Sequence, residues 1–198
     1  MKRLTSLGPR AAVSGAALIA VLTIGSTPAS ASGIFNARAF LRSYEEVPAI
    51  SSLAFGEFRL RIEGEDDSGD DAALDPQNPP VIHWELRYRG ITTPVRFAHI
   101  HFGQRSVNGG IVVTLCSNAV DAPPEVADCP EESGEVTGTI DPADVGGGAA
   151  LQGIAAGELR ELLRAIRSGV TYVNVHSDAF PGGEMRGQLV SNYRRFLP

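Results

Sequence analysis

The stretch VIHWELRYR, residues 81–89, decides the fold class of this 198-residue chain. Its apolar positions alternate with polar ones: Ile82, Trp84, Leu86 and Tyr88 against His83, Glu85, Arg87 and Arg89. Because successive side chains of a β-strand point to opposite faces of a sheet, this alternation predicts a strand with one buried and one exposed face. Gly90 follows directly and is typical of a turn.

The same alternation continues along the chain in both directions. Further strands are predicted at 35–42, 57–62, 95–102, 110–115, 134–140, 170–176 and 184–191. Turns rich in glycine and proline, at 108–110 and 181–183, separate neighbouring segments. About eight short strands with such turns favour an all-β sandwich or barrel over a fold of alternating strands and helices.

One helical segment interrupts the strands. Leu159, Leu162, Leu163 and Ile166 recur at the spacing of one helix face, and Gly169 is a natural stop after them. We expect this short amphipathic helix to lie across an open end or side of the β-structure.

The first 31 residues are predicted to be a signal peptide. Lys2, Arg3 and Arg10 accompany an apolar run over 11–25, and small residues lead up to Ala31. The run is short for a bilayer span of roughly 20 residues, and a retained anchor is the alternative. The expected mature protein is one domain, 32–198, secreted from the cell and without a membrane span.

The charge balance excludes two classes of partner. Once Lys2, Arg3 and Arg10 are removed from the 17 basic residues, 14 remain against 23 acidic ones, a net charge of −9. Nucleic acids and anionic membranes bind surfaces with clustered positive charge, so neither is an expected partner.

The segment 63–80 is acidic, rich in glycine and proline, and without periodicity. This composition predicts a loop insertion in solvent. A calcium site is the alternative, since carboxylates suit that cation, but the spacing of an EF-hand is absent.

The two cysteines, Cys116 and Cys129, are predicted to form one disulfide after export. The bond would close a loop of about 14 residues. A free or metal-binding thiol is the alternative.

Three histidines form a candidate metal site. His99 and His101 are two residues apart on a predicted strand and so share a face, and His176 has a comparable setting in its own strand. If the two strands are neighbours, the three imidazoles surround one point, and all-nitrogen ligands suit copper or zinc better than magnesium or calcium. The alternative is that the rings only hydrogen-bond to nearby carboxylates or carbonyls. His83 lies on a polar face and is expected to be exposed.

Five segments in order resemble the CHRD domain, which is named from chordin and also occurs in exported bacterial proteins. They are YEEVPAISSLAFGEFRLRI (44–62), FAHIHFG (97–103), NGGIVVTL (108–115), LLRAIRSGVTYVNVHS (162–177) and PGGEMRGQL (181–189). The resemblance covers about 35–190. It implies a non-catalytic extracellular module that binds an unknown protein or matrix partner or has a structural role.

A more distant resemblance is to copper–zinc superoxide dismutase, and it implies a Greek-key antiparallel β-sandwich. His99, His101 and His176 match copper ligands of that family, and Arg186 matches the arginine that guides an anion to the metal. The bridging histidine and the zinc-loop ligands have no match. A copper-binding, dismutase-like redox protein is therefore the alternative function. Arg186 has an alternative role as well, pairing with a carboxylate across the sheet.

Overall fold

Nine β-strands in one antiparallel sheet dominate the described part of the chain. The structure is a computed structural model that describes residues 35–63 and 80–192. The predicted signal peptide and residues 64–79 of the acidic segment lie outside the described residues. The strands are β1 (Phe35–Arg42), β2 (Phe55–Glu63), β3 (Val81–Arg89), β4 (Val95–Phe102), β5 (Gly110–Ser117), β6 (Gly134–Ile140), β7 (Thr171–Ser177), β8 (Met185–Gln188) and β9 (Val190–Ser191).

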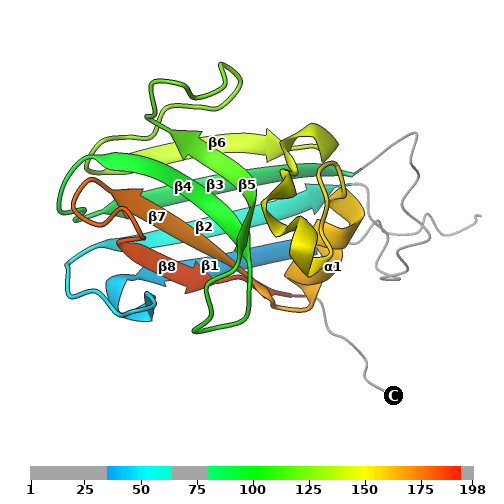
Figure 1. Cartoon of the computed structure of the whole chain (residues 1–198), viewed down its shortest axis with the longest axis horizontal. Helices are drawn as coiled ribbons and strands as arrows, with labels where there is room; N and C mark the ends of the chain where they lie inside the picture. Colours follow the sequence, from blue (N-terminus) through cyan, green and yellow to red (C-terminus); the bar gives the residue numbers. More distant parts are fainter. Residues whose placement is uncertain (1–34, 64–79, 193–198) are drawn as a thin grey trace, which may run out of the picture.

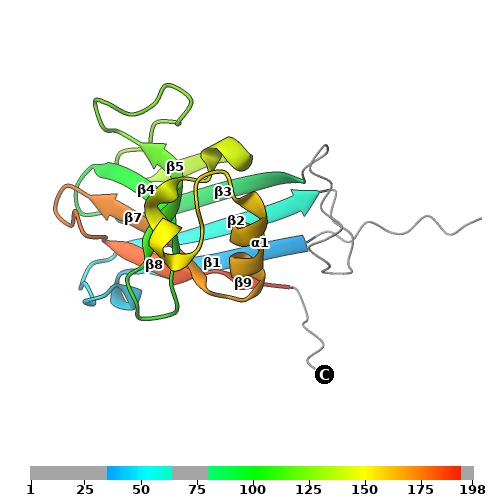
Figure 2. The ribbon, with the colours of Figure 1, turned by 45° about the vertical axis from the view of Figure 1, so that its right-hand side comes forward.

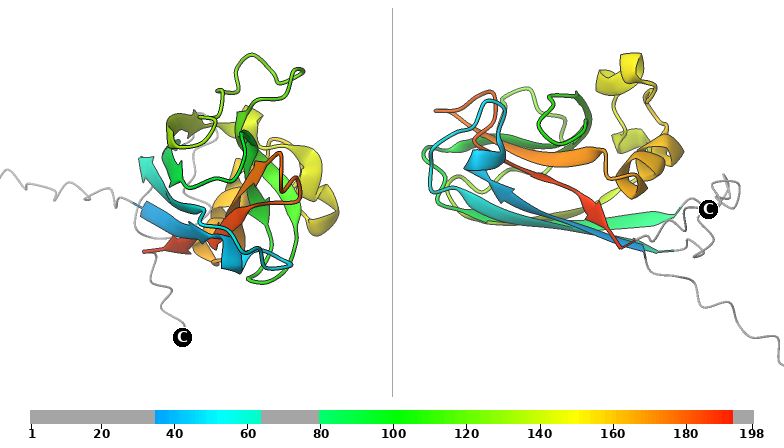
Figure 3. Two further views of the ribbon diagram at one scale, coloured as in Figure 1. Left: turned by 90° about the vertical axis from the view of Figure 1, so that its left-hand side faces the viewer. Right: turned by 90° about the horizontal axis from the view of Figure 1, so that it is seen from below.

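The sheet folds over into two layers that face each other. Its strand order is β5-β4-β7-β8-β1-β2-β3-β6, and β9 pairs with β1. One layer is β5-β4-β7-β8 and the other is β1-β2-β3-β6, joined through the β8–β1 pair (Figures 1 and 3). The chain passes between the layers after β3, β5 and β6. The all-β prediction is therefore confirmed. Because the β8–β1 pairing joins the two layers along one side, the fold lies between a sandwich and a barrel.

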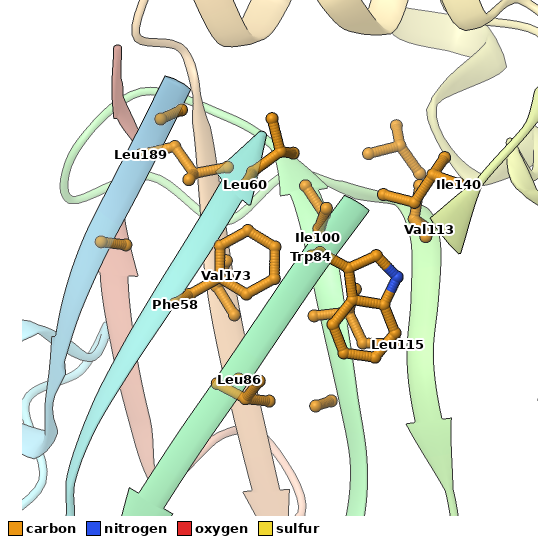
Figure 4. Close-up of a cluster of buried hydrophobic side chains, with 14 of the residues drawn as sticks. Phe58, Leu60, Trp84, Leu86, Ile100, Val113, Leu115, Ile140, Val173 and Leu189 are labelled. Atoms are coloured by element: carbon orange, nitrogen blue, oxygen red, sulfur yellow. The ribbon is translucent and has the colours of Figure 1, made fainter. Parts of the chain in front are cut away.

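The core lies between the two layers and follows from the alternation in the sequence. Ile82, Trp84, Leu86 and Tyr88 are all buried, while His83 between them is exposed as predicted. Figure 4 shows side chains of β2 and β3 meeting those of β4, β5 and β7. Burial of each large apolar side chain contributes roughly 1.5–3 kcal/mol to folding, so this interlayer contact dominates the stability.

The helical elements lie outside the two layers. Helix α1 (Leu159–Arg167) buries its leucine face and lies across one end of them, and Gly169 follows it in the left-handed conformation, as predicted (Figure 2). Three 3-10 helices accompany it, η1 (Ser43–Glu45), η3 (Pro142–Asp144) and η4 (Gly147–Gln152). Within the described ranges, no helix combines the length and apolarity that a bilayer crossing requires.

The predicted disulfide is present between Cys116, near the end of β5, and Cys129. The Asn118 side chain adds to this connection, because its amide donates to the Cys129 and Val95 carbonyls and its oxygen accepts from the Cys129 amide. The disulfide and Asn118 together attach the 117–130 connection to β4 and β5.

Replacing both cysteines by alanine should lower the free energy of unfolding by about 3 kcal/mol, because the unfolded chain loses a closed loop of about 14 residues. Chemical denaturation of the variant and the wild type measures this difference. Reduced wild type is the control and should lose a similar amount. A loss below about 1 kcal/mol in both would contradict the stabilising role.

Candidate metal centre

The pairing of β4 with β7 brings the three predicted histidines together. The two strands are antiparallel neighbours, with Phe97 opposite His176, His99 opposite Asn174 and His101 opposite Tyr172. All three imidazoles therefore project from the face of the layer that points away from the core. Ile100, Val173 and Val175 occupy the other face and are fully buried. The condition on which the metal hypothesis depends, that these strands are neighbours, is met.

The three rings are close enough to share one ion. One nitrogen from each of His99, His101 and His176 lies within 4.8 Å of the other two. The shortest approach joins His99 Nδ1 and His176 Nε2 at 3.4 Å, which is long for a hydrogen bond between them. Two nitrogens bound to one ion at about 2.0–2.1 Å lie at most about 4.2 Å apart, so separations of up to 4.8 Å would have to close by a few tenths of an ångström on binding.

Backbone carbonyls orient two of the rings. Nδ1 of His101 faces the Gly109 carbonyl at 3.0 Å, and Nδ1 of His176 faces the Pro181 carbonyl at 3.0 Å. A carbonyl can only accept, so each Nδ1 carries the proton and each Nε2 retains its lone pair for the centre. This is the arrangement that metal-binding histidines use, with the second ring nitrogen fixed by a hydrogen bond.

One ring nitrogen is left without a hydrogen bond. His101 Nε2 is buried and has no hydrogen-bond partner among the described residues. Most buried polar atoms in folded proteins are paired. Because this atom is the one that the Gly109 contact leaves with a lone pair, it is free to coordinate.

Burial keeps the imidazoles neutral. It lowers the pKa of His99 to about 3 and that of His101 to about 4, with further lowering from the neighbouring histidines. Burial also lowers the pKa of His176. A neutral imidazole is the form that binds a metal.

Arg186 lies beside this cluster but is enclosed by the protein. It is 2 % exposed, its Nη1 donates to Asn108 Oδ1 at 2.9 Å, and its Nη2 donates to the Val107 carbonyl at 3.0 Å. Its guanidinium lies 4.1 Å from the centre of the Tyr172 ring, which stacks on His101 at 4.8 Å. Arg186 thus fastens the β4–β5 loop that supplies the carbonyl to His101. The anion-guiding role stays a prediction.

The same loop is tied down at several other points. Gln188 of β8 donates to the Gly103 carbonyl, the Gly109 amide donates to the Tyr172 hydroxyl, and Asn108 donates to the Val47 carbonyl. A Cβ on Gly109 would lie 1.7 Å from the Phe102 carbonyl oxygen, so only glycine fits there. The NGG turn of the sequence therefore has a positional role at the centre.

Glu46 completes the buried polar layer and was not identified from the sequence. Burial raises the pKa of its carboxyl to about 7, although the positive charge of Arg186 acts in the opposite direction. Arg186 therefore does have a carboxyl neighbour, but that neighbour comes from the β1–β2 connection and not from across the sheet. Glu184 is also fully buried. Its carboxylate accepts hydrogen bonds from the hydroxyl groups of Ser177 and Thr92.

Comparison with known proteins gives one match. The family model described as "CHRD domain" matches residues 38–189, a range that contains His99, His101, His176 and Arg186. No curated protein and no solved structure matches the chain.

Without metal, the stability of the protein should rise with pH between about 5 and 6.5. In this window the unfolded chain protonates His99 and His101, which the folded chain keeps neutral, and the lowered pKa of His176 acts in the same direction. The contribution of the histidines is therefore complete above pH 6.5 and is lost as pH falls. Glu46 acts oppositely, since its folded carboxyl stays protonated up to about pH 7. With three histidines acting against one glutamate, the free energy of unfolding should rise by at most about 2.7 kcal/mol per pH unit. Chemical denaturation in the presence of a chelator measures this slope.

The matched control replaces His99, His101 and His176 by glutamine. Only the opposing effect of Glu46 then remains, so the slope should vanish or reverse. A slope equal to that of the wild type would show that these three histidines do not cause it.

Proposed function

The chain belongs to the CHRD family, and on this basis we propose that it is an exported, non-catalytic module that binds one copper or zinc ion through His99, His101 and His176. The buried Nε2 atom of His101, which has no hydrogen-bond partner among the described residues, supports this proposal most directly. A purely structural imidazole would use both of its nitrogens, whereas a metal ion would supply the missing partner of Nε2.

The ligand set favours copper or zinc. The three donors are neutral imidazole nitrogens, which both ions prefer and which suit magnesium and calcium poorly. When bound, the ion would act as a Lewis acid and connect β4 to β7. The carbonyls of Gly109 and Pro181 orient the rings of His101 and His176. The Phe97 ring stacks on His99 at 5.5 Å and helps to exclude water from the site.

The enclosure of the site favours binding over turnover. His99, His101 and His176 are each 7–8 % exposed, so a substrate would have little access to the centre. The dismutase-like alternative requires Arg186 to guide an anion. Its contacts with Asn108 and Val107 instead support a role in positioning the β4–β5 loop.

Two features support export. The Cys116–Cys129 disulfide fits an oxidising compartment outside the cytosol. The predicted leader adds to this from the sequence.

The metal proposal is tested with His101→Gln. Wild type grown with copper and zinc and then purified should contain one equivalent of metal. His101→Gln should bind it at least about 100-fold more weakly, because losing a direct ligand costs more affinity than losing a group that only hydrogen-bonds to a ligand. Elemental analysis and calorimetric titration measure these values. Metal at 100 times its Kd should also stabilise the wild type by about 2.7 kcal/mol.

His83→Gln is the matched control, since it removes the exposed histidine on the other layer. It should bind metal as the wild type does. A wild type that stays metal-free, with a melting temperature that copper and zinc do not change, would disprove the proposal.

Export is tested separately by expressing the full chain in a bacterial host with a standard secretion pathway. The protein outside the cytosol should begin near Ser32, as measured by mass spectrometry. Full-length protein retained in the membrane fraction would instead support the retained anchor.

A further inference from the structure

The outward surface of β1, β2 and β3, here called the arginine face, concentrates positive charge on an acidic protein. Its arginines are Arg38, Arg42, Arg59, Arg61, Arg87 and Arg89. Glu57 and Glu85, with Glu135 of β6, are the acidic residues interspersed among them. Six arginines against three glutamates leave a net charge of +3. Leaving Glu63, the last residue of β2, out of both counts, the remaining described residues contain six arginines and thirteen acidic residues, a net charge of −7.

The register places like charges side by side on this face. Arg38 of β1 lies directly opposite Arg59 of β2. Arg42, Phe55 and Arg89 form a row across β1, β2 and β3. Like charges directly opposite each other destabilise a sheet, so the fold gains nothing from the Arg38–Arg59 pair, although Glu57 lies opposite Arg87 and Glu85 lies opposite Arg59.

Internal ion pairs account for part of the positive charge only. Arg59 pairs with Glu57 at 2.9 Å, and Arg87 pairs with Glu85 and Glu135. Within the described residues, Arg38, Arg42 and Arg89 make no ion pair.

Two of these three unpaired guanidiniums lie over exposed aromatic rings. Arg38 lies 5.6 Å from the centre of the Phe40 ring, and Arg89 lies 5.8 Å from that of Phe55. Phe40 is 48 % exposed and Phe55 is 37 % exposed. The face thus offers cations and flat apolar surface side by side.

The arginine face is also hollowed. A depression of about 1030 Å³ lies over β1, β2, β3 and β6, and Arg38, Arg59, Arg61, His83, Thr137 and Thr139 are among its lining residues. Glu57 and Glu85 also line this depression, whereas Phe40, Arg42, Phe55 and Arg89 do not. An extended ligand would therefore occupy the depression and continue along the face past those residues.

We propose that the arginine face binds an acidic polysaccharide whose sugars carry carboxylates. Guanidinium groups match carboxylates with two parallel hydrogen bonds. The apolar faces of sugar rings can lie against Phe40 and Phe55. Sugar hydroxyls can donate to Glu57 and Glu85 and bond to the threonines of β6.

The interspersed glutamates favour this ligand over other polyanions. The backbone of a nucleic acid presents closely spaced phosphates, which have no donors of their own and would repel the glutamates. A sugar chain with one carboxylate per residue and several hydroxyls uses both kinds of charge on the face. The net charge of only +3 fits this lower charge density.

The test uses mature protein and polygalacturonate as the probe, at about 50 mM salt, where surface charges are least screened. Arg38, Arg42 and Arg89 are replaced together by glutamine. Binding should weaken about tenfold, as expected from three exposed charge contacts, measured by calorimetry or by retardation in an affinity gel.

The matched control replaces Arg105, Arg160 and Arg164 by glutamine, an equal change of net charge away from the face. It should bind polygalacturonate within about twofold of the wild type. Neutral dextran should not bind, and single-stranded DNA should bind more weakly than polygalacturonate. His101→Gln should bind the polysaccharide normally, which separates this site from the metal centre.

Three results would overturn the proposal. They are a wild type that does not bind polygalacturonate, equal weakening in both triple variants, and DNA binding as tight as polysaccharide binding. Circular dichroism and melting temperatures of both variants establish that they are folded.

Discussion

The antiparallel pairing of β4 with β7 is the constraint on which the rest of the structure depends. A slip of one residue in either strand would turn its side chains to the other face and move the histidines into the apolar core. Ile100, Val173 and Val175 prevent this, because each is fully buried between the layers. The packing of the core thus fixes the register, and the register gathers the three imidazoles. The stability of the core and the histidine cluster therefore share one cause.

The outer side of this strand pair shows how a polar cluster can be buried. Tyr172 and Asn174 of β7, and Arg186 of the neighbouring β8, would face solvent in an ordinary half-exposed sheet, yet all three are at most 3 % exposed. The β4–β5 and β7–β8 loops cover them and provide the carbonyls of Gly109 and Pro181. Burying polar groups is costly unless they find partners. The hydrogen bonds of Arg186 and Gln188 to the covering loop meet that requirement for these two side chains, whereas Asn174 Oδ1 and His101 Nε2 have no hydrogen-bond partner among the described residues.

Local patterns in the sequence predict most of the fold. The alternation at 81–89, the leucine spacing at 159–166 and the two cysteines each depend on near neighbours, and each prediction is confirmed. The histidine cluster could be predicted only on the condition that two distant strands pair. The carbonyls of Gly109 and Pro181 and the neighbourhood of Glu46 depend on how loops pack, which no periodicity encodes. The arginines of the arginine face occupy the polar positions of three predicted strands. Their clustering could not be predicted, because it depends on these strands being neighbours and the net charge of the chain is negative.

The folding of one sheet into two layers also determines how the molecule would be oriented. Figure 3 shows the two layers facing each other. The histidines project from the outer side of one layer and the arginine face lies on the outer side of the other. A chain that lies flat on a polymer through its arginines would turn its imidazoles toward the surrounding fluid. Immobilisation would then leave the side of the molecule that holds the histidine cluster facing the solution, and all molecules on a coated surface would share that orientation.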